Sequence, residues 1–374
     1  MIDLLIKNGI LLDSFAGRAG KYTIGIKNDR VSGVYPEGAL LPVSKEVLDI
    51  DENYITSGWI DLHTHVYPEK TTLGIDADMV GINQGVTTIL DAGSCGYKTF
   101  PDFEKSVIRK SNTRVLTWLN IAGKGLCGGR SELADQDDID IKKTADLIQN
   151  TPSIRGIKVR MSSSVLGKSG LMPLKKAKEV SKMVGRPLLV HIGNGPPSLG
   201  AIFNVLEKGD VVTHAFHGKP GGSFNEFGEP LPEMLEALKR GVYLDIGHGT
   251  SSFSFLRMEQ AIGKGIWPDS ISTDIYCSNY QGPVFSLACT VEKCLTLGMP
   301  LATAIVSVTA RPAVMIGMPE LGTVRAGSYA DFTIFQVTNE QKKFMDAEGN
   351  IREGKTGIRL RGAIKSGKVW LKNV

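Results

Sequence analysis

The sequence predicts an α/β protein: a closed (β/α)8 barrel of the TIM type, with a small β-sandwich domain formed by both chain ends. Eight strand-like runs alternate with helical segments through the centre of the chain, and short strands without a helical period occupy its two ends. Eight strand-and-helix repeats are what a closed barrel requires. The length of 374 residues exceeds the usual size of one hydrophobic core, which favours a large domain with a smaller one beside it.

The β-rich ends are expected to form one discontinuous domain of residues 1–56 and 318–374, beside a barrel of residues 57–317. Turn sequences such as Asn8-Gly9 and Asn28-Asp29 separate the first apolar runs. Near the other end, a polar segment rich in Lys, Glu and Gly separates the last two runs. The strands of this domain are expected at 3–12, 22–26, 30–35, 47–50, 330–337 and 358–369.

The barrel strands are expected at 54–65, 86–91, 114–120, 154–160, 187–191, 210–214, 242–248 and 270–274. Amphipathic segments predict helices at 140–149, 174–183, 198–207, 233–240 and 257–263, and two more follow at 285–297 and 301–308. We expect the last helix to stop near Pro312, because proline cannot continue a helix.

Composition and charge exclude several classes of protein. Hydrophobic residues make up 42% and charged residues 22% of the chain, as in an ordered globular protein. The net charge of +4 is mild and dispersed, which argues against a nucleic-acid or polybasic membrane surface. The sequence has no leader and no run of membrane-spanning length, so we expect a cytoplasmic protein with a small-molecule substrate; a homo-oligomer is left open. The five cysteines lack Cys-x-x-Cys spacing, which argues against disulfides and thiolate metal sites.

The first chemical signal is a pair of histidines at the end of the apolar run that starts at Ser57. His63 and His65 are one residue apart, and alternate side chains of a strand project to the same side, so both can hold one cation. Five of the six histidines lie at or just past the end of a predicted strand. In a barrel, that end is where the active site is built.

These strand ends supply a set of metal ligands. Neutral imidazoles and a carboxylate come from His63, His65, His191, His214 and Asp274. Five ligands exceed the needs of one tetrahedral ion, so we expect two divalent ions and a bridging anion. Lys158 is the candidate bridge, because a lysine buried beside cations would be neutral and could capture carbon dioxide as a carbamate. Zinc suits these ligands, although manganese, cobalt or iron would also fit.

Other residues are candidates for substrate binding or support. Arg160, on the same strand face as Lys158, offers a two-pronged partner for a substrate carboxylate, with a structural ion pair as the alternative. His248 is expected to orient the substrate or a supporting carboxylate. Asp61 is expected to support the metal ligands from beneath. His217, Tyr276 and the loop 123–129 are candidates for the rim.

Together these residues resemble the amidohydrolase superfamily, and the resemblance covers nearly the whole chain. It rests on Gly58-Trp59-Ile60-Asp61-Leu62-His63-Thr64-His65, Lys158, Val190-His191, Thr213-His214, Ser272-Thr273-Asp274 and the segment 321–331. Lys158 is similar to the lysine of the carbamylated binuclear enzymes. The segments 214–219 and 247–253 resemble the deacetylase-type branch.

The resemblance implies hydrolysis of an acyl group, with acetyl as the first choice, from a small N-acyl amino acid or an acylated hydroxy acid. It implies that His63 and His65 bind the more buried ion and that His191 and His214 bind the more exposed one. Asp274 would be both a ligand and the catalytic proton carrier.

Three alternatives stay open. Ring opening of a cyclic amide, as in dihydroorotases and hydantoinases, would use the same metals, but dihydroorotases place an arginine where this chain has Tyr67. Adenine deaminases are expected to have a carboxylate in place of Lys158. A catalytically inactive scaffold barrel is the third alternative, and the retention of every candidate ligand argues against it.

Overall fold

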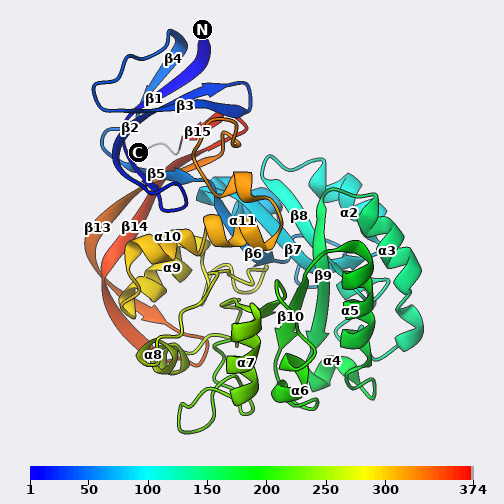
Figure 1. The fold of residues 1–374 in the computed structure, drawn as a ribbon. Helices are drawn as coiled ribbons and strands as arrows, with labels where there is room; N and C mark the ends of the chain where they lie inside the picture. The colour runs from blue at the N-terminus through cyan, green and yellow to red at the C-terminus, as the bar shows by residue number, and fades with distance from the viewer. Residues whose placement is uncertain (372–374) are drawn as a thin grey trace.

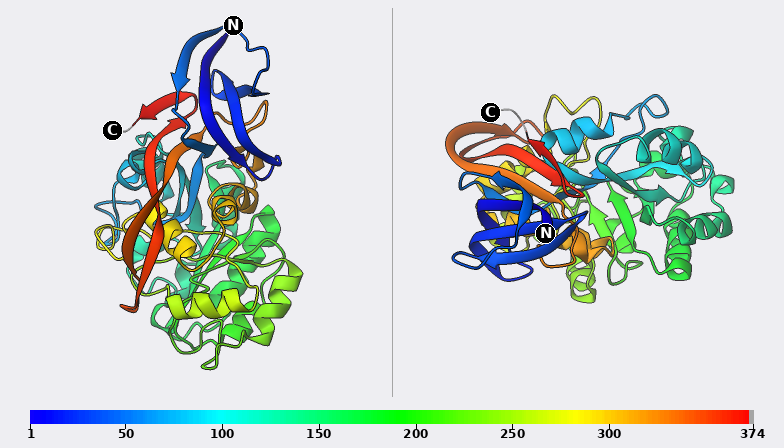
Figure 2. Two further views of the ribbon diagram at one scale, coloured as in Figure 1. Left: turned by 90° about the vertical axis from the view of Figure 1, so that its left-hand side faces the viewer. Right: turned by 90° about the horizontal axis from the view of Figure 1, so that it is seen from above.

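Two sheets, built from different parts of the chain, organise the molecule (Figure 1). The computed structural model describes residues 1–371. One sheet is parallel and curls around the centre of the molecule, and the other joins strands from both chain ends. Figure 2 shows that strands from residues 2–57 and 332–371 lie on the same side of the molecule, in the second sheet. The predicted fold class, a barrel with a small β domain from both ends, is confirmed.

The barrel sheet runs in sequence order from β6 to β12, and every neighbouring pair is parallel. Residues 270–275 take the eighth position: single bridges join Ser270 to Asp245 and Ile275 to Thr64, which closes the ring. The strands are Trp59–Thr64 (β6), Val86–Gly96 (β7), Arg114–Asn120 (β8), Ile154–Met161 (β9), Leu188–Ile192 (β10), Val211–Thr213 (β11) and Tyr243–Leu244 (β12).

The barrel differs from the prediction at three strands. The run 54–65 is divided at Gly58, whose N–H donates to Asp331 O at 2.8 Å, so its first half, Tyr54–Ser57 (β5), belongs to the other sheet. The predicted strands 242–248 and 270–274 form only β12 and the two bridges. Side chains hold these segments instead, because Asp245 accepts hydrogen bonds from the hydroxyls of Ser270 and Ser272, each at 2.6 Å.

The helices cover the outside of the barrel (Figure 1). They are Ala77–Val80 (α1), Phe100–Phe103 (α2), Ile141–Gln149 (α3), Ser163–Leu166 (α4), Met172–Val184 (α5), Leu199–Phe203 (α6), Pro232–Arg240 (α7), Phe255–Gly263 (α8), Leu287–Thr296 (α9), Leu301–Val306 (α10) and Ala310–Met315 (α11), with short turns Ile82–Gln84 (η1), Glu104–Ile108 (η2), Gly125–Gly128 (η3), Gln136–Asp138 (η4) and Pro319–Leu321 (η5). Within residues 1–371, none of them is both long and apolar enough to cross a bilayer. Pro312 does not end α10 as predicted; it lies in the first turn of α11, where its missing N–H costs no helical bond.

The second sheet has the order β15-β14-β13-β5-β1-β2-β3, with β4 beside β1. Its strands are Ile2–Asp13 (β1), Arg18–Lys27 (β2), Arg30–Pro36 (β3), Ser44–Asp49 (β4), Tyr54–Ser57 (β5), Phe332–Met345 (β13), Ile351–Lys365 (β14) and Lys368–Leu371 (β15). A separate apolar core lies under it, with Leu11, Ile24, Ile55 and Phe332 fully buried. The domain limits 1–56 with 318–374, and 57–317, stay a prediction.

The hairpin of β13 and β14 leaves the second sheet and runs along the barrel (Figure 2). The polar segment predicted to separate two strands is therefore mostly strand. Phe344 and Ile358 in this extension belong to the barrel core. Glu292 of α9 anchors the hairpin, because its buried carboxylate accepts from Ile358 N at 2.6 Å and pairs with Lys342 Nζ at 2.7 Å. The small domain is thereby tied to the barrel far from the sheet itself.

The replacement Glu292→Ala should lower the free energy of unfolding by about 2 kcal/mol, because it leaves the buried N–H of Ile358 without an acceptor. Glu292→Gln, which keeps an acceptor, should cost less. Urea denaturation at neutral pH measures both, with the exposed Glu320→Ala as the control that stays within about 0.5 kcal/mol of wild type. Equal stability of wild type and Glu292→Ala would contradict the anchoring role.

Candidate metal centre and substrate cavity

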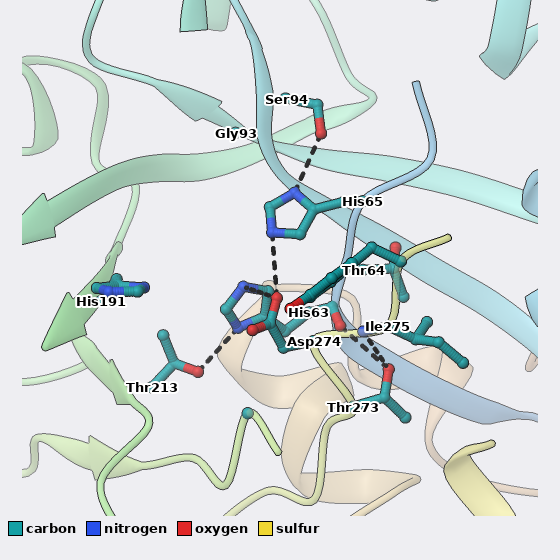
Figure 3. A network of polar contacts seen from close by, with 12 residues as sticks. His63, Thr64, His65, Gly93, Ser94, His191, Thr213, Thr273, Asp274 and Ile275 are labelled. Atoms are coloured by element: carbon teal, nitrogen blue, oxygen red, sulfur yellow. Dashed lines mark hydrogen bonds and ion pairs between the residues drawn. The ribbon is translucent and has the colours of Figure 1, made fainter. Parts of the chain in front are cut away.

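The structure brings the side chains singled out in the sequence to one mouth of the barrel (Figure 3). His63 lies near the end of β6 and His65 just beyond it, while His191 lies in β10 and His214 directly after β11. Asp274 lies on the segment that closes the barrel. Because all these elements are parallel, their C-terminal ends meet on one face.

Asp274 lies between the first two histidines (Figure 3). Its Oδ1 is 3.3 Å from His63 Nε2 and 3.1 Å from His65 Nε2. The other ring nitrogens are held by hydroxyls: His63 Nδ1 by Thr213 Oγ1 at 2.9 Å, and His65 Nδ1 by Ser94 Oγ at 3.1 Å. These contacts fix both rings so that their Nε2 atoms share the carboxylate.

The second pair of histidines lies beside the first. His214 Nδ1 is 2.6 Å from Gly247 O, and since a carbonyl only accepts, Nδ1 carries the proton. The lone pair of His214 Nε2 therefore points away from the loop, 2.8 Å from His191 Nδ1 and 4.0 Å from Asp274 Oδ2. His214 therefore lies between His191 and the carboxylate that the first pair shares.

Lys158 reaches the same point from β9. Its side chain is fully buried, and Nζ lies 3.1 Å from His63 Nε2. Gly93 makes this approach possible, because a Cβ there would lie 2.8 Å from Lys158 Cγ. Burial lowers the pKa of Lys158 to about 7, although the charge of Asp274 opposes the shift. A sizeable fraction of the amine is therefore neutral near neutral pH, as carbon dioxide capture would require.

The charge state of the cluster favours a cation. Burial lowers the pKa of His63 and of His191 well below the ordinary value, and that of His214 to about 3, so these rings are neutral at neutral pH. Burial alone would raise the pKa of Asp274, but the hydrogen bond from His65 and the electrostatic influence of His214 and Lys158 lower it, so the carboxylate is ionised.

The donor set fits divalent metal ions. The ligand atoms of His63, His65 and Asp274 all lie within 4.8 Å of one another. Metal bonds of about 2.0–2.1 Å in a tetrahedron place ligand atoms roughly 3.3 Å apart, close to the separations observed here. Neutral nitrogens and an anionic oxygen at this spacing repel one another unless a proton or a cation lies between them. Imidazole, carboxylate and amine-derived ligands suit ions such as zinc.

The backbone is strained at two members of the cluster. His214 has a φ of 67° and Asp274 a φ of 47°, in the left-handed region that side chains with a Cβ disfavour. Such a conformation costs of order 1–3 kcal/mol and persists only where the surroundings impose it. Both residues are turned out of their strands at this point, which aims their side chains into the mouth.

A layer of polar groups beneath the cluster was only partly expected. Asp61 lies there as predicted: Oδ2 accepts from Thr273 Oγ1 at 2.6 Å and Oδ1 accepts from His63 N at 3.2 Å. Burial raises its pKa to about 7. Sequence reasoning missed Asp91, which accepts from Ser94 N at 2.8 Å, and Asp245. Their positions in the strand-like runs 86–91 and 242–248 were the available signal.

The cluster opens into a cavity of about 700 Å³. His63, His65, Lys158, His191 and Asp274 form part of its wall, with other residues contributed by the barrel loops. These are Arg160, Lys219, Tyr276, Cys127, Leu126, Gly129, Lys70, Arg130, Asn194, residues 71–73 and 250–252, Ser162 and Ser164. Apart from Asp274, the loops contribute three cations to this wall and two groups that are neutral at neutral pH. The cations are Lys70, Arg130 and Lys219, and the neutral groups are the thiol of Cys127 and the phenol of Tyr276.

The remaining candidates take different places. Arg160 lines the cavity but pairs with Glu132, at 3.0 Å. Tyr276 also lines the cavity, and its phenol forms a hydrogen bond with the hydroxyl of Thr250. His217 is buried instead of lying on the rim.

His248 lies behind the cavity wall and is fully buried. Its Nδ1 donates to Gly249 O at 2.8 Å, and its Nε2 is 2.7 Å from Nζ of Lys293, a buried lysine of α9 that sequence reasoning missed. Both ring nitrogens are thus occupied by protein atoms, which suits support of the loop that follows β12 better than direct substrate contact.

Residues 324–370 match a family model described as a deacetylase-like composite domain. A deacetylase of Enterococcus faecalis is 36% identical over 98% of this chain and 99% of its own length. Among solved structures, one described as an adenine deaminase is 35% identical with a TM-score of 0.94 and covers 100% of both chains. Another, described as a dihydroorotase, is 31% identical with a TM-score of 0.89 and covers 99% of both chains.

Removal of divalent ions should destabilise the protein, because ions that bind only the folded state stabilise it. We expect dipicolinate to lower the midpoint of thermal unfolding, and added zinc to restore it. His63→Asn should contain less metal by elemental analysis than wild type and should respond less to the chelator. The buried His217→Gln, outside the cluster, is the matched control. Equal metal contents of wild type and His63→Asn would contradict the ligand set.

Proposed function

Because this chain belongs to the deacetylase-like branch of the amidohydrolase superfamily, we propose that it removes an acyl group, with acetyl as the first choice, from a small N-acyl amino acid or acylated hydroxy acid. That the protein is a hydrolytic enzyme follows from the family. The proposed substrate class is supported by a single observation: the cluster of His63, His65, Lys158 and Asp274 opens into a cavity whose other charged groups are cations. Such a wall suits an anionic substrate.

Two divalent ions, when bound, lower the pKa of a water molecule and polarise the scissile carbonyl. The residues that would hold them are His63, His65, His191, His214, Lys158 and Asp274. Lys158 would contribute as a carbamate: its neutral amine attacks carbon dioxide, a carbon–nitrogen bond forms and one proton is released. The product would offer two oxygens that share one negative charge, in place of one neutral nitrogen.

Asp274 is the proposed proton carrier. Its carboxylate is ionised and lies at the centre of the cluster, where it can take a proton from the attacking water. The same proton then goes to the leaving amine or alkoxide, so the carboxylate is regenerated. His248 and Lys293 would act by holding the loop of Gly249, where a Cβ would lie 2.5 Å from Asp274 Oδ2.

The competing activities are less well supported by the site. Tyr67, which stands where dihydroorotases have an arginine, is buried and directed at Asp102 at 2.6 Å, and it does not line the cavity. Lys158 occupies the position where adenine deaminases are expected to have a carboxylate. The chain is nevertheless similar to a structure described as an adenine deaminase, so release of ammonia from adenine has to be assayed as well.

A scaffold protein without activity is disfavoured because every candidate ligand is present and faces one cavity or its floor. Zinc as the metal, the carbamate on Lys158, a cytoplasmic location and the state of assembly stay predictions from the sequence.

Hydrolysis should be tested with N-acetyl amino acids of both chiralities, acetylated 2-hydroxy acids, dihydroorotate, a hydantoin and adenine. We expect turnover to be confined to the acylated acids, because their carboxylate matches the cationic wall. Turnover is measured as release of acetate for the acylated acids, as ring opening followed by absorbance for the cyclic amides, and as release of ammonia for adenine. Activity on the cyclic amides or on adenine alone would reject the proposal.

Lys158→Ala should reduce kcat by at least about 100-fold, since it removes an anionic ligand of the metal centre. Short carboxylic acids such as acetate or propionate should restore part of the activity by supplying the missing oxygens. Lys175→Ala, at an exposed lysine of α5, should behave as wild type and show no rescue. Undiminished turnover in Lys158→Ala would remove the bridging role.

A further inference from the structure

Arg160, the cation predicted to bind the substrate carboxylate, already has a carboxylate partner. Its Nη1 lies 3.2 Å from Glu132 Oε1 and 3.0 Å from Oε2. The side chain of Glu132 is only 1% exposed, so this buried carboxylate already compensates the charge of Arg160. A second anion would therefore gain less from this guanidinium than from a cation that has no counter-charge.

Lys219 is a half-buried cation of the same cavity that has no such partner among residues 1–371. It follows β11 by six positions, is half-buried and lines the same cavity as the metal cluster. Within residues 1–371 its ammonium forms no ion pair. The other two loop cations of the wall, Lys70 and Arg130, are exposed and so are already solvated. Burial lowers the pKa of Lys219, opposed by the charge of Asp274, which shows that its charge is poorly compensated.

The backbone that carries Lys219 is fixed on both sides. Lys219 N donates to His217 Nδ1 at 3.1 Å, and the buried His217 holds this turn. Gly218 lies against the carboxylate of Glu348, where a Cβ would lie 1.8 Å from Oε1, so no other residue fits there without a shift.

Glu348 itself comes from the tip of the β13–β14 hairpin. Its Oε2 accepts from Ser254 Oγ at 2.6 Å, and Ala347 N donates to Phe253 O at 3.0 Å. The tip therefore contacts the loops that follow β11 and β12, both of which line the cavity. An ammonium on such a braced loop is positioned before the substrate arrives, which reduces the ordering cost of binding.

From this geometry we infer that Lys219, and not Arg160, binds the carboxylate of the substrate and so determines specificity for acylated acids over their neutral counterparts. The inference rests on the proposed function, since it names the group that selects the substrate class of that same site. A half-buried ammonium with no ion-pair partner among residues 1–371 gains most from an anion that enters the cavity, whereas Arg160 already has the counter-charge of Glu132.

The test compares an acid with its neutral analogue. Wild type and Lys219→Met are assayed with the best N-acetyl amino acid and with its carboxamide. Lys219→Met should raise KM for the acid at least tenfold, change kcat less than threefold, and leave kcat/KM for the carboxamide within twofold. Lys219→Arg, which keeps the charge, should recover most of the loss for the acid. Lys175→Met is the matched control on the exposed face of α5.

Two results would overturn the inference: an unchanged KM for the acid, or an equal loss of kcat/KM for the acid and the carboxamide. A second readout needs no turnover. Binding of phenylacetate, an unreactive carboxylate, is measured by calorimetry, and its Kd should rise at least tenfold in Lys219→Met. If wild type hydrolyses no acylated acid, the proposed function fails. The comparison of Kd values then still tests whether Lys219 binds a carboxylate, because equal values in wild type and Lys219→Met would contradict that role.

Discussion

The close approach of neutral ring nitrogens, an amine and a carboxylate at one mouth of the barrel is the constraint on which the rest of the structure depends. Separations of 2.8–3.3 Å between these atoms require a proton or a metal ion between each pair. Burial disfavours additional protons on His63 and on Lys158, because it lowers the pKa of both groups. Neutral nitrogens beside one carboxylate are a donor set that suits divalent cations.

Keeping such a cluster in place requires support from several directions. Hydroxyls of Thr213 and Ser94 orient two rings, and the carbonyl of Gly247 orients a third. Asp61 joins the first strand to the closing segment through Thr273. These contacts impose the left-handed backbone at His214 and Asp274. Such a conformation lowers stability and is typical of functional sites, where the positions of the side chains matter more than the stability of the backbone.

The small β domain contributes to the site through its hairpin. Strands β13 and β14 extend past their sheet, anchor on Glu292, and end in a tip that holds two cavity loops. The family model covers this part of the chain, residues 324–370, although none of the candidate metal ligands lies in it. A domain that looks like an appendage is thus a brace for the substrate side of the cavity, as the position of Glu348 beside Gly218 illustrates.

The sequence by itself determined the fold class and the candidate ligands at the strand ends, because alternation of apolar runs and the position of His63 or Asp274 within a run are local properties. It also placed Lys158 on the inner face of its strand, where the structure has it buried beside His63. Tertiary structure alone decided which charges are paired. Arg160 and Glu132, His248 and Lys293, and Glu348 and Ser254 are far apart in the chain, so their pairing depends on distances that only the closed barrel sets. The same distances leave Lys219 without an ion-pair partner in the part of the chain that the structure describes, residues 1–371.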